Sequence, residues 1–239
     1  MPIKILFISH RSDIGGGELS LFDLVLWLHL KKKIIPYIIL SEKGGLYDKF
    51  KDAGFHVELV PLPPLKKIKI SSIINIIRIV KKNSINVIHA NTTRAAMYSV
   101  FAKIFLNVKF VWHNRGTDKR GIFEYILSLF TDKLIAISHS VKSGLINAGV
   151  NPKKISVIYN GINLDLYNKN SDKKKRNIHP EITKNNKNII SQKKYNVGLI
   201  GRFTSEKGHK YLINAADLII NKYNFKNINF KFIRNDNFG

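Results

Sequence analysis

Short apolar runs recur along the first two thirds of the chain, and a helix-like segment separates each run from the next. The runs cover residues 3–9, 34–40, 55–60, 85–90, 108–114 and 133–138. Strands buried on both faces of a parallel sheet read as continuous runs of this kind, and parallel strands need helical crossovers. The pattern therefore predicts an α/β fold, in which helices cover both faces of a parallel sheet.

The segments between the runs carry helical signals of different kinds. Residues 17–30 are apolar almost all round, which predicts a buried helix. In the helix predicted over 70–82, the helical period places one apolar stripe on a single face: Ile70, Ile73, Ile74, Ile77 and Val80. Further helices are predicted over 44–54, which Gly54 closes, and over 94–106, 120–130 and 139–148.

The character of the chain changes after residue 167. Residues 168–194 are polar, rich in lysine and asparagine, and have little periodicity, which is typical of a linker or mobile loop. A strand, a helix over about 208–222 and a strand at 228–233 follow. One such unit cannot build a core of its own. We therefore expect a first domain over 1–167 and the start of a second α/β domain over 195–239, truncated by the end of the sequence.

The net charge and the composition of the chain limit the classes of binding partner that we expect. The 40 Lys+Arg outnumber the 16 Asp+Glu, which gives a net charge of +24 that attracts anions: nucleic acid, anionic lipid or phosphorylated small molecules. Codon bias in an AT-rich genome is the alternative explanation of this excess. Without aromatic–basic interleaving we expect no nucleic-acid partner. Without a signal peptide or an apolar run near 20 residues, we expect a cytoplasmic protein that has no disulfide or cysteine-bound metal, since the chain lacks cysteine.

A glycine-rich turn follows the first predicted strand, in the stretch ISHRSDIGGGELSL over 8–21. Glycines between a strand and a helix let backbone N–H groups approach an anion, and the helix N-terminus adds partial positive charge. Gly16 and Gly17 are the candidates for such contact. The spacing differs from the G-x-G-x-x-G fingerprint of dinucleotide sites, and a turn that merely needs glycine is the alternative.

Two histidines end neighbouring predicted strands. His89 lies in VIHANTT, which also contains Asn91, and His113 lies in FVWHNRG. A histidine at this edge can exchange a hydrogen bond with a substrate hydroxyl near neutral pH, although a strand-end histidine is often structural. No spacing of His, Asp and Glu resembles a metal site.

Two cations follow the first strand of the second domain, in VGLIGRFTSEKGHKYLINAA over 197–216. Arg202 and Lys207 occupy a loop at the carboxyl edge of that strand. Two fixed cations match a pyrophosphate and stabilise the charge that develops when a glycosyl–phosphate bond breaks. A solvated loop in a basic protein is the alternative.

Together these stretches resemble the retaining glycosyltransferases of family four, which have GT-B architecture. The residues that carry the resemblance are GGGELSL, His113, the stretch LIAISHSVKSGLINAGVNPKKISVIYNGINLDLY over 134–167, and residues 197–216. The resemblance implies two Rossmann-like domains that face each other across a cleft. The first mostly holds the acceptor, and the second mostly holds the nucleotide-activated sugar.

The resemblance also implies roles for individual residues. Arg202 and Lys207 neutralise the donor diphosphate, and His113 bonds the transferred sugar. Gly16 and Gly17 supply backbone contact to that diphosphate or to the acceptor. His89 and Asn91 lie on the acceptor side, while Asn160 and Gly161 are structural. The implied partners are a nucleotide-diphosphate sugar and a glycan or lipid-linked acceptor. The implied reaction retains the anomeric configuration, uses no metal or other cofactor, and serves cell-envelope or polysaccharide biosynthesis.

The sequence departs from the family pattern near its end. The paired-glutamate motif of the second domain is absent, and FKFIRNDNFG stands where relatives have a strand leading into Gly-Asp-Gly. These departures leave a non-catalytic remnant of such an enzyme open as one alternative. The net charge of +24 leaves a basic nucleic-acid-binding domain open as another.

Relatives in this family often act at the inner face of the cytoplasmic membrane. The Ile-rich segment 70–82 is flanked by Lys66, Lys67, Lys69, Arg78, Lys81 and Lys82. This arrangement suggests a peripheral contact with an anionic membrane. In the alternative, the isoleucines pack on the sheet and the lysines are simply solvated.

Overall fold

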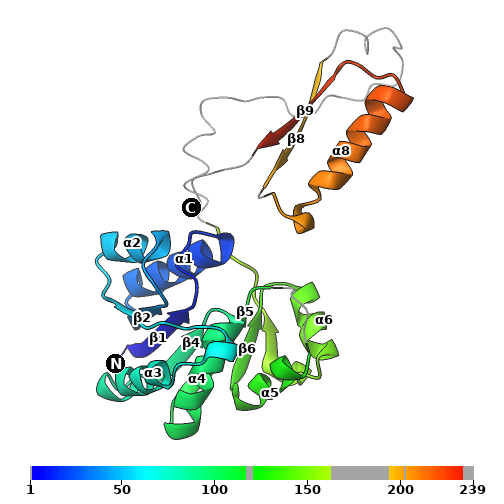
Figure 1. Ribbon diagram of the computed structural model, residues 1–239. Helices are drawn as coiled ribbons and strands as arrows, with labels where there is room; N and C mark the ends of the chain where they lie inside the picture. The colour runs from blue at the N-terminus through cyan, green and yellow to red at the C-terminus, as the bar shows by residue number, and fades with distance from the viewer. Residues whose placement is uncertain (1, 117–120, 163–193, 202, 234–239) are drawn as a thin grey trace. The chain divides into compact units, whose positions relative to one another are not determined.

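The computed structural model describes residues 2–116, 121–162, 194–201 and 203–233 (Figure 1). The chain forms two compact units, Met1–Asn163 and Leu164–Gly239. Each unit has a sheet of its own.

The first unit contains a seven-stranded parallel sheet, as the apolar runs predict. The strands lie in the order β3-β2-β1-β4-β5-β6-β7, and every neighbouring pair is parallel. They are β1 (Ile3–Ser9), β2 (Ile34–Leu40), β3 (Val57–Leu59), β4 (Val87–Ala90), β5 (Lys109–Asn114), β6 (Lys133–Ala136) and β7 (Ile155–Val157). The sheet confirms the predicted Rossmann-like α/β fold.

Helices cover both faces of this sheet. They are α1 (Gly16–Leu30), α2 (Gly45–Asp52), α3 (Ile70–Lys82), α4 (Thr93–Phe105), α5 (Ile122–Phe130) and α6 (His139–Asn147), with short 3-10 turns η1 (Leu65–Lys67) and η2 (Pro152–Lys154). Alternate residues of β1 point to opposite faces, so that Leu6 joins a core with α3, α4, α5 and α6, whereas Phe7 joins a second core with α1 and α2.

Two details of the helix prediction are wrong. The helix α1 is not buried all round, because Trp27 is 52% exposed and Leu30 is 68% exposed. The predicted apolar face of α3 is correct only in part, since Ile73 and Val80 are buried and Ile77 packs against the core. Ser72, Ile73, Ile76, Ile79 and Val80 are buried, whereas Ile70 is 71% and Ile74 is 48% exposed. The apolar residues of α3 cover a wider arc than its buried face, while Ser71, Asn75, Arg78 and Lys82 share the opposite side. The period therefore locates the apolar side of the helix but not which part of it is buried.

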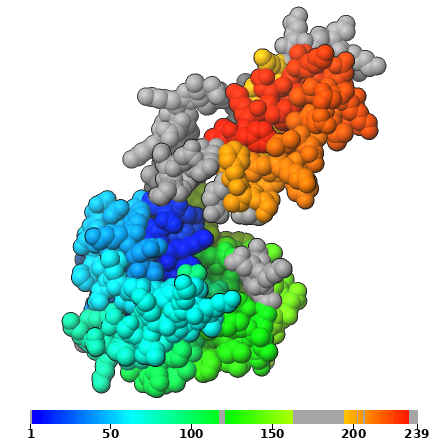
Figure 2. All heavy atoms as spheres, viewed as in Figure 1, coloured from blue at the N-terminus to red at the C-terminus, as the bar shows by residue number. Residues whose placement is uncertain are grey.

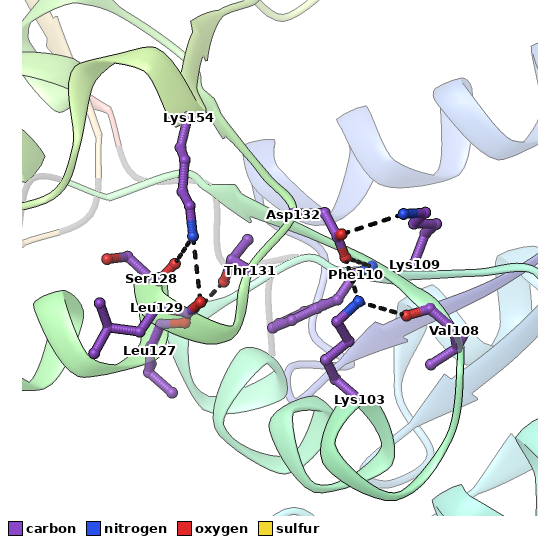
Figure 3. A network of polar contacts seen from close by, with 10 residues as sticks. All are labelled: Lys103, Val108, Lys109, Phe110, Leu127, Ser128, Leu129, Thr131, Asp132 and Lys154. Atoms are coloured by element: carbon purple, nitrogen blue, oxygen red, sulfur yellow. Dashed lines mark hydrogen bonds and ion pairs between the residues drawn. The ribbon is translucent and has the colours of Figure 1, made fainter.

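Polar contacts connect α4 and α5 to the amino-terminal ends of the neighbouring strands (Figure 3). Asp132 forms ion pairs with Lys103 at 2.9 Å and Lys109 at 3.6 Å, and accepts a hydrogen bond from the N–H of Phe110. Burial raises the pKa of the Asp132 carboxyl, but the bonds from Lys103 and Phe110 outweigh it and leave the pKa below its ordinary value. Lys154 donates to the carbonyls at the end of α5 and so caps that helix.

The second unit contains a parallel pair of strands, β8 (Tyr195–Ile200) and β9 (Ile228–Ile233). Between them lie the 3-10 turn η4 (Ser205–Lys207), the helix α8 (His209–Asp217) and its π-helical continuation η5 (Leu218–Lys222). The strand–helix–strand order is the one predicted for residues 195–233.

Candidate functional site

The two strand-end histidines meet at the carboxyl edge of the first unit's sheet. The strands β4 and β5 are neighbours, with His89 opposite Val111. The His89 Nε2 atom lies 3.2 Å from His113 Nδ1, and both side chains are buried. Ligands of open α/β sheets bind beyond this edge of the strands. The structure therefore brings together two residues that the sequence singled out separately.

Burial keeps these histidines neutral. Desolvation and the nearby charge of Arg115 lower the pKa of His89 to about 3. Desolvation, Arg115 and His89 lower the pKa of His113 to about 2. His10, at the end of β1, hydrogen bonds to Thr92 at 2.7 Å, and desolvation, Arg94 and Arg11 lower its pKa to about 4. At neutral pH each ring therefore offers one N–H donor and one acceptor nitrogen.

Arg115 lies beside this pair and was not singled out from the sequence. Its Nε atom donates to Asn91 Oδ1 at 2.6 Å, and one terminal nitrogen donates to Asn160 Oδ1 at 2.7 Å. The other terminal nitrogen lies 3.4 Å from His113 Nδ1. Asn160, expected to be structural, also accepts a bond from Ser20 Oγ at 3.1 Å. The guanidinium thus links the ends of β4 and β5 to the segment after β7, and Asn160 links that segment to α1.

The amino end of α1 reaches the same cluster. A Cβ atom on Gly17 would lie 3.2 Å from Arg115 Cδ, so glycine at this position permits the close approach of the arginine. Gly16 is exposed and has open space around its Cα. Desolvation lowers the pKa of Arg115 to about 10, an effect that the buried Glu18 opposes by raising it. Arg115 therefore stays charged at neutral pH.

Two buried polar atoms of this cluster have no hydrogen-bond partner among the described residues: Asn91 Nδ2 and His113 Nε2. Both residues are among the predicted site residues. Leaving a buried polar group unpaired costs about 1–3 kcal/mol, so such atoms in a folded protein require an explanation. At the ligand-binding edge of an α/β sheet, the explanation with a functional consequence is a ligand that completes these bonds.

In the second unit, Lys207 is exposed and ends η4. Its side-chain carbons pack beside Gly201. A Cβ atom placed on Gly201 would lie 3.6 Å from Lys207 Cγ, which is an ordinary van der Waals distance. Gly208 follows with φ 75°, a left-handed conformation that favours glycine, and α8 begins at His209. Both ring nitrogens of His209 lack a partner among the described residues. Arg202 lies outside the described residues.

A pocket of about 520 Å³ lies at the opposite, amino-terminal edge of the first sheet. Lys103, Asp132 and Lys154 line it, but their charged groups already bond to one another or to backbone carbonyls (Figure 3). The charged groups of these three side chains thus already have partners within the protein. Within the described ranges no cluster of three or more His, Asp or Glu could hold a metal ion.

Comparison with known proteins places the chain in a family. The model of glycosyltransferase family 4 matches residues 14–166, and the chain belongs to this family. Over 163 residues it is 30% identical to an uncharacterized 41.2 kDa protein in the cps region of Klebsiella pneumoniae, covering 61% of this chain and 43% of that protein. It is 22% identical over 246 residues to the capsular polysaccharide biosynthesis glycosyltransferase CapH of Staphylococcus aureus, covering 98% of this chain and 62% of CapH.

A solved structure shares the fold. The Anabaena protein HepE, in complex with UDP and glucose, superposes with a TM-score of 0.68 at 19% identity, covering 96% of this chain and 60% of HepE. The chain thus spans 43% of the length of the Klebsiella protein and 62% of the length of CapH. No helix in the described part of the chain is long and apolar enough to cross a bilayer.

Proposed function

We propose that this chain transfers a sugar from a nucleoside-diphosphate donor to an acceptor hydroxyl in the assembly of a cell-surface polysaccharide, with retention at the anomeric carbon. Membership of glycosyltransferase family 4 supports this function, as do the functions of its relatives: CapH is a capsular polysaccharide glycosyltransferase, and HepE holds UDP and glucose. The same family membership does not favour a nucleic-acid-binding role for the basic charge.

The observation that carries the proposal is the buried, unpartnered Nε2 atom of His113 at the carboxyl edge of the sheet, which lacks a hydrogen bond to any described residue. We assign it to a hydroxyl of the transferred sugar, with His89 and Asn91 on the acceptor side. Gly16 and Gly17 offer backbone N–H groups, and Arg202 and Lys207 of the second unit neutralise the diphosphate.

In the proposed reaction, the bond from the anomeric carbon to the phosphate oxygen breaks and the acceptor oxygen bonds to the same face of that carbon. The acceptor proton passes to the leaving diphosphate, which acts as the base. The protein contributes orientation of the two substrates and stabilisation of the developing negative charge. The two cations supply that stabilisation without a metal ion or other cofactor.

Calorimetric titration of the chain with UDP-glucose, a representative nucleotide sugar, tests this function. We expect saturable binding that His113→Phe weakens, because phenylalanine keeps a ring of similar size but has no N–H donor. His113→Gln is the matched variant, since its amide nitrogen lies near the position of Nε2 and can still donate. Absence of binding in the unmodified chain would count against the proposal and favour a non-catalytic remnant.

We further propose a peripheral membrane contact through η1 and the start of α3. Here four exposed apolar side chains, Leu65, Ile68, Ile70 and Ile74, alternate with the exposed lysines Lys66, Lys67 and Lys69. Figure 2 shows this segment, coloured cyan, at the surface of the first unit. Apolar side chains that enter the headgroup region beside lysines are typical of binding to anionic membranes.

Co-sedimentation with phosphatidylcholine vesicles, with and without phosphatidylglycerol, tests the membrane contact. Each lysine near an anionic surface contributes about 1 kcal/mol, so replacing Lys66, Lys67 and Lys69 with serine is expected to weaken binding about a hundredfold. The matched control replaces the exposed lysines Lys222, Lys226 and Lys231, which removes the same charge from the second unit. Equal losses of vesicle binding in both variants would mean that binding depends only on net charge, and would contradict the assignment of the contact to η1 and the start of α3.

A further inference from the structure

Arg115 contacts two residues that each carry a buried nitrogen with no partner among the described residues. Its Nε atom is 2.6 Å from Asn91 Oδ1, and a terminal nitrogen is 3.4 Å from His113 Nδ1. The unsatisfied atoms, Asn91 Nδ2 and His113 Nε2, are in each case the other polar atom of the same side chain. One guanidinium therefore lies against one polar atom of each side chain, and the other polar atom of each is buried without a partner among the described residues.

The chemistry of the guanidinium decides which nitrogen of His113 carries the proton. Arginine has five N–H donors and no acceptor, so a ring nitrogen that faces it is stable only as an acceptor. His113 Nδ1 therefore holds the lone pair. Because this imidazole is neutral, its single proton lies on Nε2. His89 Nε2, 3.2 Å from the same Nδ1, then donates to it, which fixes the tautomer of His89 as well.

The same argument orients the Asn91 amide. Only its oxygen can accept from Arg115 Nε, so Oδ1 faces the guanidinium and the NH₂ group faces away. The Asn91 side chain is fully buried, and the backbone N–H of Asn91 donates to the Ile8 carbonyl, which holds the residue against β1. A flip of the amide would put two N–H groups against a cation.

We propose that Arg115 is a positioning residue that sets the polarity of His113 and Asn91, so that each presents an N–H donor, and that oxygen acceptors of the ligand complete these two bonds. The ligand class is an oxygen-rich molecule, such as a sugar or phosphate ester. Its assignment to the nucleotide sugar rests on the proposed function, whereas the polarity of the two side chains does not.

Nitrogen-15 NMR of the histidine rings in the full chain tests the proposal, because the two neutral tautomers have distinct ring-nitrogen shifts. His113 is identified by its loss from the spectrum of His113→Gln. We expect His113 to carry its proton on Nε2 near pH 7. A proton on Nδ1 in the unmodified chain would overturn the proposal without any variant of Arg115 being needed.

The variants Arg115→Met and Arg115→Lys separate positioning from packing. Hydrogen bonds to charged groups contribute about 1.5–3 kcal/mol, so Arg115→Met is expected to shift the tautomer ratio of His113 toward Nδ1–H by at least about tenfold. Arg115→Lys keeps a cation beside Nδ1 and is expected to restore the Nε2–H form. The control Arg78→Met removes an arginine of α3, far along the chain from the site, and leaves the ratio unchanged.

The outcomes distinguish this proposal from the proposed function. An unchanged ratio in Arg115→Met would mean that the arginine does not set the tautomer, whatever the chain binds. A shifted ratio in Arg115→Met, together with no response of His113 Nε2 to UDP-glucose, would support Arg115 as a positioning residue but contradict the assignment of the ligand.

Discussion

Replacing Arg202 and Lys207 together with alanine is expected to abolish binding of a nucleoside diphosphate. Lys207 is exposed at the end of η4, beside the glycine that follows β8 and one residue before the turn into α8. A charge-assisted hydrogen bond contributes about 1.5–3 kcal/mol. Loss of two such bonds therefore weakens binding by roughly two to four powers of ten.

Calorimetric titration with UDP measures this loss directly. The double variant Lys226→Ala with Lys231→Ala is the matched control, since it removes two exposed cations from the same unit but away from η4. The protection of the chain by UDP in a thermal melt gives a second readout, because a ligand that binds only the folded state raises its melting temperature. Undiminished binding by the Arg202 and Lys207 variant would contradict the assignment of the diphosphate to these cations.

Acidification from pH 7 to pH 5 is expected to destabilise the first unit by about 4 kcal/mol through His89 and His113 alone. Burial lowers the folded-state pKa of His89 to about 3 and of His113 to about 2, below the ordinary value of 6.5. Between these values the unfolded chain binds more protons than the folded chain. The stabilisation is therefore complete above about pH 6.5 and is lost as the pH falls toward the folded-state pKa.

Each of these two histidines contributes about 2 kcal/mol over this interval, and His10, whose pKa is also lowered by burial, acts in the same direction. Thermal unfolding followed by circular dichroism measures the effect. His113→Gln is expected to remove about 2 kcal/mol of the pH dependence, whereas His56→Gln, at an exposed position, is the control. A melting temperature that stays constant from pH 7 to pH 5 would show that the folded chain accepts protons at these rings.

Most of the fold could be predicted from the sequence because its strands are buried on both faces. The runs over 3–9 and 34–40 coincide with β1 and β2. The phase of α3 could not be predicted in the same way. Isoleucine covers a wider arc of this helix than its buried face does. The choice between Ile74 and Ile76 as a buried residue depends on how α3 packs against its neighbours in the core, which the helical period does not determine.

The candidate site could be predicted in part. His89, Asn91 and His113 could be predicted as site residues because each ends or follows a strand, and neighbouring parallel strands bring such residues together. Arg115 could not be predicted as a site residue, because its role depends on Asn91 and Asn160, which lie 24 and 45 positions away. The available signal was an arginine two residues after a strand-end histidine. In a chain with 40 Lys+Arg, the presence of an arginine at one position does not by itself distinguish a site residue.

The measurement that tests the central claim most directly compares UDP-glucose with UDP in calorimetric titrations of the unmodified chain, His113→Phe and His113→Gln. If the Nε2–H group of His113 bonds the sugar, His113→Phe weakens UDP-glucose binding by about tenfold, as expected for one buried hydrogen bond, and leaves UDP binding unchanged. His113→Gln then retains most of the affinity for UDP-glucose. Equal affinities of the unmodified chain and His113→Phe for UDP-glucose, or equal losses for both ligands, would contradict the claim.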